Sequence, residues 1–456
     1  MDENRKYFGT DGIRGVAGTA PLNPDCLMSL GQAVAKIFGD RRVSGRARVL
    51  IGKDTRLSGY MIESSLAAGI TSMGADVLLC GPIPTPGVAY LTKSMRVDVG
   101  IVISASHNPF EDNGIKIFAA DGYKLPDSVE LEIENLLGSH DLASQTVDSG
   151  KIGRASRIDD AVGRYTVFLK ENFPRELSLE NLRIGVDCAH GAGYVVAPQT
   201  LSELGAEVVA RGVSPSGKNI NSGFGSLFPD VVGKLVVEQN LNLGVALDGD
   251  GDRCILVDEK GSVLDGDVIL AICALDRKRR NCLANNTVVA TVMSNIGFDM
   301  VMSENGIKVV RTRVGDRAVL EEMIRQGAVL GGEQSGHTIF GDIATTGDGL
   351  LTALMVMSIM EREGKPLSEL ADAFIKFPQK LINIKVSSKP ELELVNGLQD
   401  AIQKKEAEMG AKGRILVRYS GTEDKVRVMV ECEDENDCKK HAQDIAEIVE
   451  REIGVM

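Results

Sequence analysis

Three carboxylates lie two residues apart in the segment DGDGDR, at Asp248, Asp250 and Asp252. In an extended loop, alternate side chains point in the same direction, so these three can converge on one hard divalent cation. Magnesium usually completes its coordination shell with water and with phosphate oxygens of a substrate. The spacing therefore predicts a Mg²⁺ site that also receives a phosphate group.

The same aspartates also match the start of a calcium-binding EF-hand loop, with Glu259 at its twelfth position. That interpretation requires glycine at the sixth position, where the chain has Arg253, and it requires a helix on each side. The flanking segments LGVAL and CILVD instead have the composition of strands. A plain acidic surface turn is the other alternative, and the apolar strand before the loop argues against it.

Two serines, Ser104 and Ser106, follow an apolar run in the segment GIVISASHNP. Backbone N–H groups at a helix start favour an anion, and a phosphorylated serine would carry roughly −1.5 to −2 charges. The rival interpretation is a hydrolase triad, but the chain lacks a G-x-S-x-G elbow. His107 directly follows Ser106, and neighbours on an extended chain point to opposite sides, so we expect His107 to be badly placed as that serine's base. The local residues do not decide between the two serines.

The segment RYSGTEDKVR combines a Ser-Gly-Thr turn with flanking guanidinium groups. Backbone amides, two hydroxyls and arginines are good ligands for a phosphate dianion, although a surface hairpin with capping hydroxyls would look similar. The candidate ligands are Arg418, Ser420, Gly421, Thr422 and Arg427.

Two further segments carry polar groups that suit a sugar phosphate. In GGEQSGH, Glu333, Ser335 and His337 can hydrogen-bond sugar hydroxyls, and a helix N-cap is the alternative. In FGTDGIRG, Arg14 lies in a turn bracketed by glycines, and a structural N-terminal turn is the alternative.

The elements that carry these loops form a repeat. Residues 48–109, 182–253 and 286–337 each read as strand, helix, glycine turn, strand, helix, strand and polar loop. Runs of Val, Ile and Leu without alternation are typical of strands buried on both faces, so we expect α/β units with parallel or mixed sheets. Open α/β sheets bind ligands at the carboxyl ends of their strands. We therefore expect the three loops to meet in one cleft, rather than to belong to unrelated stacked repeats.

The remaining segment predicts a small α+β domain. Residues 391–409 have a helical pattern, and a strand, a loop and a strand follow. Ala442, Ile445, Ile448 and Val449 fall at the spacing of a closing amphipathic helix. Four domains are expected, with boundaries at 1–157, 158–260, 261–375 and 376–456.

The composition is that of a soluble globular enzyme, with 43% hydrophobic and 25% charged residues among 456. Lysine and arginine number 51 and aspartate and glutamate 64, and the net charge of −13 disfavours non-specific nucleic-acid binding. The N-terminus has no signal-peptide pattern, and the apolar run at 350–360 is too short to span a bilayer, so it predicts a buried helix. Eight scattered cysteines indicate free thiols and a cytoplasmic location.

Together these segments resemble the α-D-phosphohexomutase superfamily over essentially the whole chain. FGTDGIRG, SASHNPFEDNGIK, DGDGDR, GGEQSGH and RYSGTE occur in the family's order. The resemblance implies a four-domain fold of three similar α/β repeats with mixed sheets plus a C-terminal α+β domain, around a central cleft.

The resemblance also implies residue roles. Ser106 would be the phosphoserine, and one of its oxygens would bind Mg²⁺ with the three aspartates. Lys116 and Arg253 match positions near the transferred phosphoryl group. Glu333 and Ser335 match the sugar-binding loop, with His337 beside them, and Arg14 is a further substrate-binding candidate. Lys116 is the candidate for proton transfer, with His107 and His337 as alternatives.

Members of the family that act on glucosamine phosphate typically read E-Q-S-G-H, so Gln334 favours interconversion of glucosamine 6-phosphate and glucosamine 1-phosphate. Glucosamine 1,6-bisphosphate would be the intermediate or activator. The alternatives are a phosphomannomutase or phosphoglucomutase, a non-catalytic phosphosugar-binding protein and a metal phosphatase. Tyr419 and Asp424 depart from the family's usual phosphate-loop residues. The expected partner is a small phosphosugar, without nucleic acid or membrane, and the expected assembly is a monomer or homodimer.

Overall fold

The computed structural model describes residues 6–9, 11–137, 142–420 and 424–455. The chain forms two compact units. The large unit comprises Met1–Met293 and Ile307–Asp372, and the small unit comprises Ser294–Gly306 and Ala373–Met456.

The three sheets of the large unit share one topology. In each repeat the first strand lies between the second and the third and is parallel to both, and a fourth strand pairs antiparallel with the third. The mixed α/β repeats predicted from the sequence are therefore confirmed. The strand orders are β4 (Asp76–Pro82), β3 (Arg48–Lys53), β5 (Val99–Ile103), β6 (Asp112–Ala119); β9 (Glu207–Arg211), β8 (Arg183–Asp187), β10 (Leu243–Leu247), β11 (Cys254–Asp258); and β14 (Lys308–Thr312), β13 (Thr287–Thr291), β15 (Leu330–Gly332), β16 (Thr338–Phe340).

Two of these sheets are extended by short strands. In the first repeat, β2 (Gly12–Val16) pairs with β6 and β1 (Phe8–Gly9) pairs with β2, while β7 (Ala155–Arg157) pairs with β4. In the second repeat, β12 (Val263–Leu264) pairs with β11. The pairing of β2 with β6 places Arg14 opposite Gly114, beside the strand that carries Lys116.

Helices cover both faces of the first sheet. Val49 and Ile51 belong to a core with residues of α1 (Pro24–Asp40) and α2 (Ser58–Ser72). On the opposite face, a Cβ on Gly100 would lie 2.0 Å from Thr92 Oγ1 of α3 (Thr85–Ser94), so only glycine permits this close approach. Burial on both faces explains why the strands read as continuous apolar runs.

The apolar run at 350–360 lies within α11 (Gly349–Glu363) and is almost wholly buried, as predicted. The other helices of the large unit are α4 (Asp127–Leu137), α5 (Ala161–Glu171), α6 (Val196–Glu203), α7 (Asp230–Gln239), α8 (Gly266–Arg279), α10 (Asp316–Gln326) and α12 (Leu367–Ala371).

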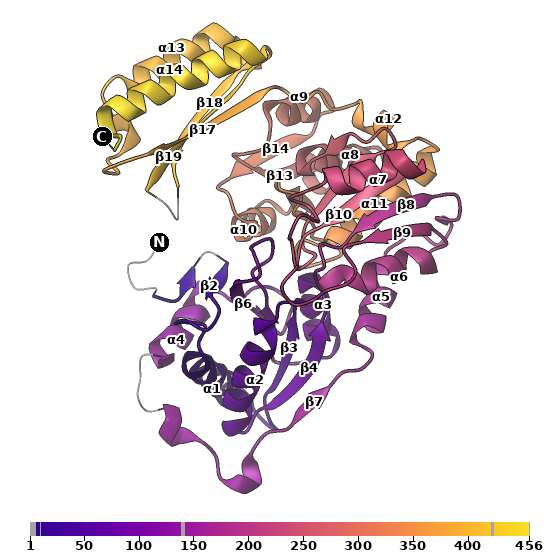
Figure 1. Ribbon diagram of the computed structural model, residues 1–456, viewed down its shortest axis with the longest axis vertical. Helices are drawn as coiled ribbons and strands as arrows, with labels where there is room; N and C mark the ends of the chain where they lie inside the picture. Colours follow the sequence, from indigo (N-terminus) through magenta and orange to yellow (C-terminus); the bar gives the residue numbers. More distant parts are fainter. Residues whose placement is uncertain (1–5, 10, 138–141, 421–423, 456) are drawn as a thin grey trace. The chain divides into compact units, whose positions relative to one another are not determined.

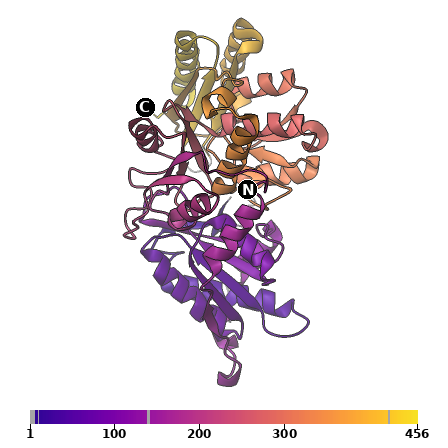
Figure 2. The same ribbon diagram turned by 90° about the vertical axis from the view of Figure 1, so that its right-hand side faces the viewer.

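The small unit is an antiparallel sheet in the order β17 (Gln379–Lys385), β19 (Lys425–Glu431), β18 (Arg414–Tyr419). Helices α13 (Leu398–Met409) and α14 (Glu435–Ile453) lie side by side against it (Figures 1 and 2). The helix expected over 391–409 starts later than predicted, because Gly397 adopts a left-handed φ of +74° directly before α13.

Helix α9 (Ile296–Glu304) belongs to the small unit, although the sequence repeat assigns it to the third sheet. The buried Glu431 carboxylate accepts hydrogen bonds from the Ile296 N–H at 3.1 Å and from Arg414 Nη2 at 2.8 Å. Asn295 donates to the Phe377 carbonyl at 3.0 Å. These bonds anchor the start of α9 to β19.

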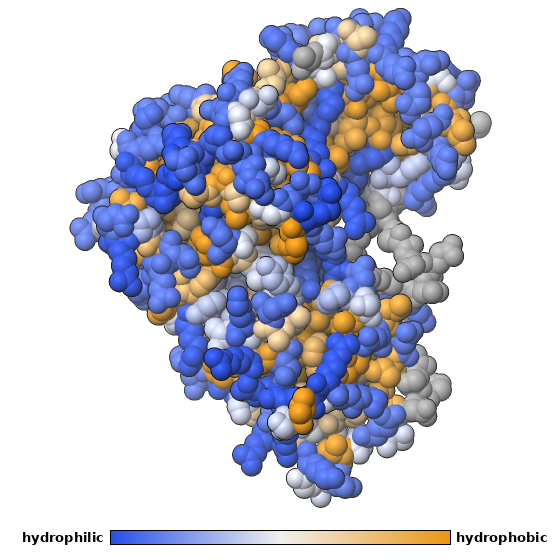
Figure 3. Space-filling view, turned by 180° about the vertical axis from the view of Figure 1, so that it is seen from behind, coloured by the Kyte–Doolittle hydropathy of each residue, from blue (hydrophilic) through white to orange (hydrophobic). Residues whose placement is uncertain are grey.

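All eight cysteines are free thiols, as predicted. Within the described residues, the helices are all too short or too polar to cross a membrane. Hydrophilic residues cover most of the face shown in Figure 3, and hydrophobic residues appear between them in small areas, as is ordinary for a folded protein.

Candidate active site

Three polar loops of the large unit meet, as the sequence predicted. They are residues 104–111, 248–253 and 333–337, and each joins the third strand of its sheet to the antiparallel fourth strand. Ser106 of the first loop contacts Asp248 of the second, and Asp252 of the second contacts His337 of the third. The shared topology of the three sheets therefore brings the loops together.

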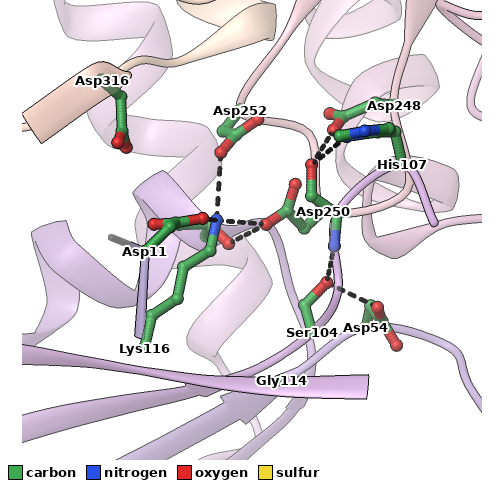
Figure 4. Close-up of polar contacts among 12 residues, drawn as sticks. Asp11, Asp54, Ser104, His107, Gly114, Lys116, Asp248, Asp250, Asp252 and Asp316 are labelled. Carbon is green, nitrogen blue, oxygen red and sulfur yellow. Dashed lines mark hydrogen bonds and ion pairs between the residues drawn. The ribbon is translucent and has the colours of Figure 1, made fainter. Parts of the chain in front are cut away.

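Ser106 is almost completely buried and directs its hydroxyl at the acidic loop. Its Oγ donates a hydrogen bond of 2.5 Å to Asp248 Oδ2. Ser104, the other candidate, instead donates to Asp54 Oδ2 at 2.6 Å and accepts from the Ser106 N–H at 2.9 Å (Figure 4). In this structure, Ser106 is thus the serine whose side chain faces the three aspartates.

His107 lies closer to Ser106 than the sequence analysis expected. Its Nδ1 is 3.4 Å from Ser106 Oγ (Figure 4). The expectation assumed an extended chain, but Ser106 has a φ of +51°, so consecutive side chains do not alternate. Burial and the nearby Arg253 lower the pKa of His107 to about 4, so its ring is neutral at pH 7.

The carboxylates of Asp248, Asp250 and Asp252 are buried, with ligand oxygens within 4.8 Å of one another. They converge through a tight turn and not through the extended loop assumed from the sequence: Gly251 has a φ of +69° and donates to the Asp248 carbonyl. Among the residues that the structure describes, Asp250 Oδ1 and Asp252 Oδ1 are buried without a hydrogen-bond partner. Oxygen atoms left in this state suit a hard divalent cation.

The Lys116 ammonium lies among three carboxylates and bridges them. Its Nζ is 3.1 Å from Asp250 Oδ2, 3.3 Å from Asp252 Oδ2 and 3.4 Å from Asp11 Oδ2 (Figure 4). Burial alone would lower the pKa of Lys116, but these three carboxylates raise it well above its usual value. The side chain is therefore a fixed positive charge next to the acidic loop.

The acidic loop contains carboxyl groups with opposite pKa shifts. Burial raises the pKa of Asp248, and the carboxylates of Asp252 and Asp250 raise it further. Burial also acts to raise the pKa of Asp252, but Lys116 and His337 outweigh this effect and hold it well below its usual value. The three carboxyl groups thus concentrate negative charge in a buried loop, and nearby cations are needed to compensate this charge.

Asp11 is a site residue that the sequence analysis missed. Its carboxylate accepts from Arg14 Nη2 at 2.6 Å, and it also pairs with Lys116 and Lys124. Lys124 in turn pairs with Asp316 at the start of α10. The position of Asp11 beside Arg14 in FGTDGIRG was a usable signal, whereas nothing local marks Lys124 or Asp316.

Arg253 and the residues of the third loop lie beside the acidic loop. Arg253 Nε is 3.9 Å from Asp252 Oδ1, and it is buried with no hydrogen-bond partner in the described part of the chain. His337 Nδ1 is 3.7 Å from Asp252 Oδ2, and its Nε2 accepts from the Gly347 N–H at 3.2 Å. The Glu333 carboxylate accepts from the Gly315 N–H at 3.0 Å, and Ser335 is exposed.

The remaining candidates belong to the small unit. Arg418 on β18 lies directly opposite Arg427 on β19, and burial together with Arg427 lowers the pKa of Arg418. Like charges that lie directly opposite each other on paired strands repel, and an anion between them relieves the repulsion. Ser420 is buried, and its Oγ lacks a hydrogen-bond partner among the described residues. Gly421 and Thr422 lie outside the described residues.

The two departures in the phosphate loop have partners within the small unit. The Tyr419 hydroxyl donates to the Pro390 carbonyl at 2.5 Å. Asp424 Oδ1 is 3.0 Å from Lys389 Nζ, which offsets its negative charge. The Lys389 ammonium therefore compensates the carboxylate that Asp424 adds next to the phosphate loop.

Comparison with protein families matches four domains of one family to the chain. The matches are phosphoglucomutase/phosphomannomutase α/β/α domains I, II and III and the C-terminal domain, at residues 5–143, 163–261, 265–377 and 381–448.

Curated relatives match over the full length. The chain is 54% identical over 451 residues to a phosphoglucosamine mutase from Syntrophotalea carbinolica, covering 99% of the chain and 98% of the relative. It is 53% identical over 450 residues to a phosphoglucosamine mutase from Geobacter metallireducens, covering 99% of both chains.

Solved structures share the fold. A phosphoglucomutase/phosphomannomutase family protein from Burkholderia thailandensis aligns with a TM-score of 0.79 at 23% identity, covering 98% of this chain and 99% of the other. Aspergillus fumigatus N-acetylphosphoglucosamine mutase, in complex with GlcNAc-6P and magnesium, aligns with a TM-score of 0.67 at 17% identity, covering 99% and 96%.

Proposed function

The chain belongs to the phosphoglucomutase/phosphomannomutase family, and from this membership we propose that it interconverts glucosamine 6-phosphate and glucosamine 1-phosphate. Relatives more than half identical to it are named phosphoglucosamine mutases. The single observation that supports the chemistry best is the hydrogen bond of 2.5 Å from Ser106 Oγ to Asp248. It places the serine that would carry the phosphoryl group against the acidic loop.

The proposed reaction starts with a phosphoryl group on Ser106. A free hydroxyl of the sugar phosphate attacks phosphorus, the bond from phosphorus to Ser106 Oγ breaks, and the hydroxyl's proton ends on Ser106 Oγ. The product is glucosamine 1,6-bisphosphate. The intermediate then reverses its orientation in the site. Ser106 Oγ attacks the other phosphorus of the bisphosphate, and its proton passes to the sugar oxygen that leaves. The phosphoserine is restored and no phosphate is released.

The three aspartates fit a Mg²⁺ ion, because two of their buried oxygens have no hydrogen-bond partner among the described residues. Asp248, Asp250 and Asp252 would hold the ion, with an oxygen of phosphorylated Ser106. When bound, Mg²⁺ would offset the carboxylate charge and polarise the phosphoryl oxygens.

Protein cations would stabilise the transferred group. Phosphoryl transfer depends mainly on positioning and on electrostatic stabilisation of the phosphoryl oxygens. Lys116 and Arg253 lie beside the acidic loop, and Arg14 is held by Asp11 at 2.6 Å. We propose that these three side chains contact the transferred phosphoryl group.

Substrate binding would use two further sets of residues. Glu333, Ser335 and His337 would bind the sugar hydroxyls. Arg418, Ser420 and Arg427, with Gly421 and Thr422, would bind the phosphate that is not transferred. The paired arginines and the buried Ser420 hydroxyl support this assignment, because a phosphate dianion complements both.

The test combines mass spectrometry with kinetics. We expect purified protein, incubated with a hexose 1,6-bisphosphate, to carry one phosphate on Ser106. We also expect kcat/KM to be higher for glucosamine 6-phosphate than for glucose 6-phosphate or mannose 6-phosphate. A higher value for either of the latter would replace the substrate assignment. Release of inorganic phosphate without isomerisation would identify a phosphatase, and binding without turnover a phosphosugar-binding protein. The cytoplasmic location and the monomeric or dimeric state stay predictions.

A further inference from the structure

Arg56 is a completely buried arginine that lies outside every motif named above. It follows β3, and its guanidinium reaches the loop that follows the neighbouring strand β5. Its Nη2 donates to the carbonyls of Ser106 at 2.9 Å and Asn108 at 2.8 Å. Its Nη1 donates to the carbonyls of Pro109 and Asp112, and its Nε to Asp54 Oδ2 at 2.8 Å.

These contacts use the full donor capacity of the side chain. A guanidinium has five N–H donors in a rigid planar fork, and here five acceptors surround it. Four of the acceptors are backbone carbonyls of residues 106–112. One side chain thus fixes the path of most of the loop that carries Ser106.

The polar backbone groups of Ser106 are held from both sides. Its N–H donates to Ser104 Oγ at 2.9 Å, and Ser104 Oγ donates to Asp54 Oδ2 at 2.6 Å (Figure 4). Its carbonyl accepts from Arg56 and also from Asn221 Nδ2 at 2.9 Å. Asp54 therefore accepts hydrogen bonds from both Ser104, which holds the Ser106 N–H, and Arg56, which holds the Ser106 carbonyl.

Ser106 needs such support because its φ of +51° is unfavourable for a residue with a side chain. Strained conformations of this kind persist only where the surroundings determine them. The strained backbone directs Ser106 Oγ at Asp248, so the groups that hold the backbone also aim the hydroxyl.

We propose that Arg56 is a positioning residue for phosphoryl transfer, which holds the 106–112 loop so that Ser106 Oγ faces the acidic loop, with Asp54, Ser104 and Asn221 completing the same frame. The inference rests on the proposed function, in which Ser106 carries the phosphoryl group. It also gives Ser104 a role: this serine orients the Ser106 N–H and does not carry phosphate itself.

The experiment separates positioning from a merely structural role. Arg56→Lys keeps the charge and loses the planar fork, so the loop should shift while the sugar and phosphate ligands stay in place. We expect kcat to fall about 10²-fold with KM within about threefold of wild type, since small misplacements of a reacting group have costs of that order. The rate at which a hexose 1,6-bisphosphate phosphorylates Ser106, followed by intact mass and peptide mapping, should fall in parallel.

The matched control is Glu63→Gln. Glu63 pairs with Lys53 at 2.5 Å, and both side chains are buried in the same repeat, but this pair belongs to the packing of α2 against β3. Glu63→Gln should therefore lower the melting temperature and leave kcat of the folded protein near the wild-type value. A structural role for Arg56 would give the same pattern for Arg56→Lys.

The outcomes are distinguishable. If wild-type protein gains no phosphate on Ser106, the proposed function fails. If wild type is phosphorylated and folded Arg56→Lys has wild-type kcat and labelling rate, the positioning role is wrong. Should Arg56→Lys fail to fold, Asn221→Ala and Ser104→Ala decide, because each removes one support of Ser106 and leaves the Arg56–Asp54 pair intact. A lower kcat with unchanged KM supports the proposal, and wild-type kcat in both overturns it.

Discussion

Ser106 Oγ and Asp248 Oδ2 lie 2.5 Å apart, although the two residues are separated by 142 positions in the chain. They follow β5 and β10, which are equivalent strands of two sheets with one topology. A serine hydroxyl next to the acidic loop could exchange a phosphoryl group beside a bound cation. The first prediction therefore concerns the loss of this hydroxyl.

Ser106→Ala should lose activity by on the order of 10⁴-fold or more, as removal of a covalent nucleophile does in other enzymes. The melting temperature should change little, because the substitution removes one hydroxyl. Steady-state kinetics and thermal unfolding measure the two effects. Ser64→Ala, an exposed serine of α2, is the control. Retention of more than a few per cent of activity in Ser106→Ala would exclude it as the phosphoryl carrier.

Features that depend on local sequence were predicted correctly. The apolar runs identified the strands of the three repeats, and the position of each polar loop after a buried strand identified the three loops that meet. Backbone conformation at single residues was not predictable in this way. The left-handed φ of Ser106 brought His107 near its hydroxyl, and Gly251 turned the acidic loop, because both depend on tertiary contacts.

Partners that come from distant segments were also out of reach. Arg56 donates to carbonyls about 50 residues away, and Lys124 pairs with Asp316 across 192 positions. No sequence motif marks either contact. Any residue can supply a carbonyl acceptor, and an ion pair requires only that the two side chains lie close together in the fold. The assignment of α9 to the small unit depends on distant partners in the same way, since Ile296 bonds to Glu431 and Asn295 to Phe377.

Metal removal should abolish activity, and Mg²⁺ should restore it. A second readout is independent of turnover: Mg²⁺ at about 100 times its dissociation constant should stabilise the protein by about 2.7 kcal/mol. Asp250→Asn should reduce or abolish this thermal shift, because Asp250 Oδ1 is buried and lacks a hydrogen-bond partner within the described residues. An undiminished shift in Asp250→Asn would place the cation elsewhere.

Substitutions of Lys116 test whether this residue acts through its positive charge or by transferring a proton. Three carboxylates hold its ammonium in the charged form, so we expect an electrostatic role. Lys116→Met should lower kcat about 10²- to 10³-fold, the usual cost of losing one stabilising group. Lys116→Arg keeps the charge and should recover part of that loss. Equal losses in both variants would instead favour proton transfer by Lys116, and His107→Gln would then show whether the neighbouring imidazole shares that role.

Arg418→Ala and Arg427→Ala should weaken substrate binding in the small unit. A hydrogen bond to a charged group contributes about 1.5–3 kcal/mol, so KM should rise roughly 10- to 100-fold. The effect on kcat should be smaller if the arginines bind the phosphate that is not transferred. Arg414→Ala is the comparison. Arg414 lies on the same strand as Arg418 but pairs with Glu431 of β19 at 2.8 Å, so its loss should affect stability more than KM. Unchanged KM in both arginine variants would remove them from the phosphate site.

The buried pair of Asp348 and Tyr165 predicts a pH-dependent stability. The Tyr165 hydroxyl donates to Asp348 Oδ2 at 2.7 Å, and the Leu351 N–H donates to Asp348 Oδ1 at 2.9 Å. Burial raises the pKa of Asp348 to about 6 from its ordinary 3.8. Between these two values the folded protein binds the proton more tightly than the unfolded chain does. The carboxyl group's contribution to stability is therefore full below about pH 4 and is lost as the pH rises to 6.

Asp348→Asn keeps a neutral acceptor at the start of α11 and removes the titration. The melting temperature of wild type relative to Asp348→Asn should therefore fall between pH 4 and pH 6 and stay constant above. A shift of about two pKa units corresponds to about 3 kcal/mol at most. Asp265→Asn, which alters the N-cap of α8, controls for the loss of a capping carboxylate. If the difference between wild type and Asp348→Asn is the same at pH 4.5 and pH 7.5, the carboxyl group does not titrate in this window, and burial does not raise its pKa as described.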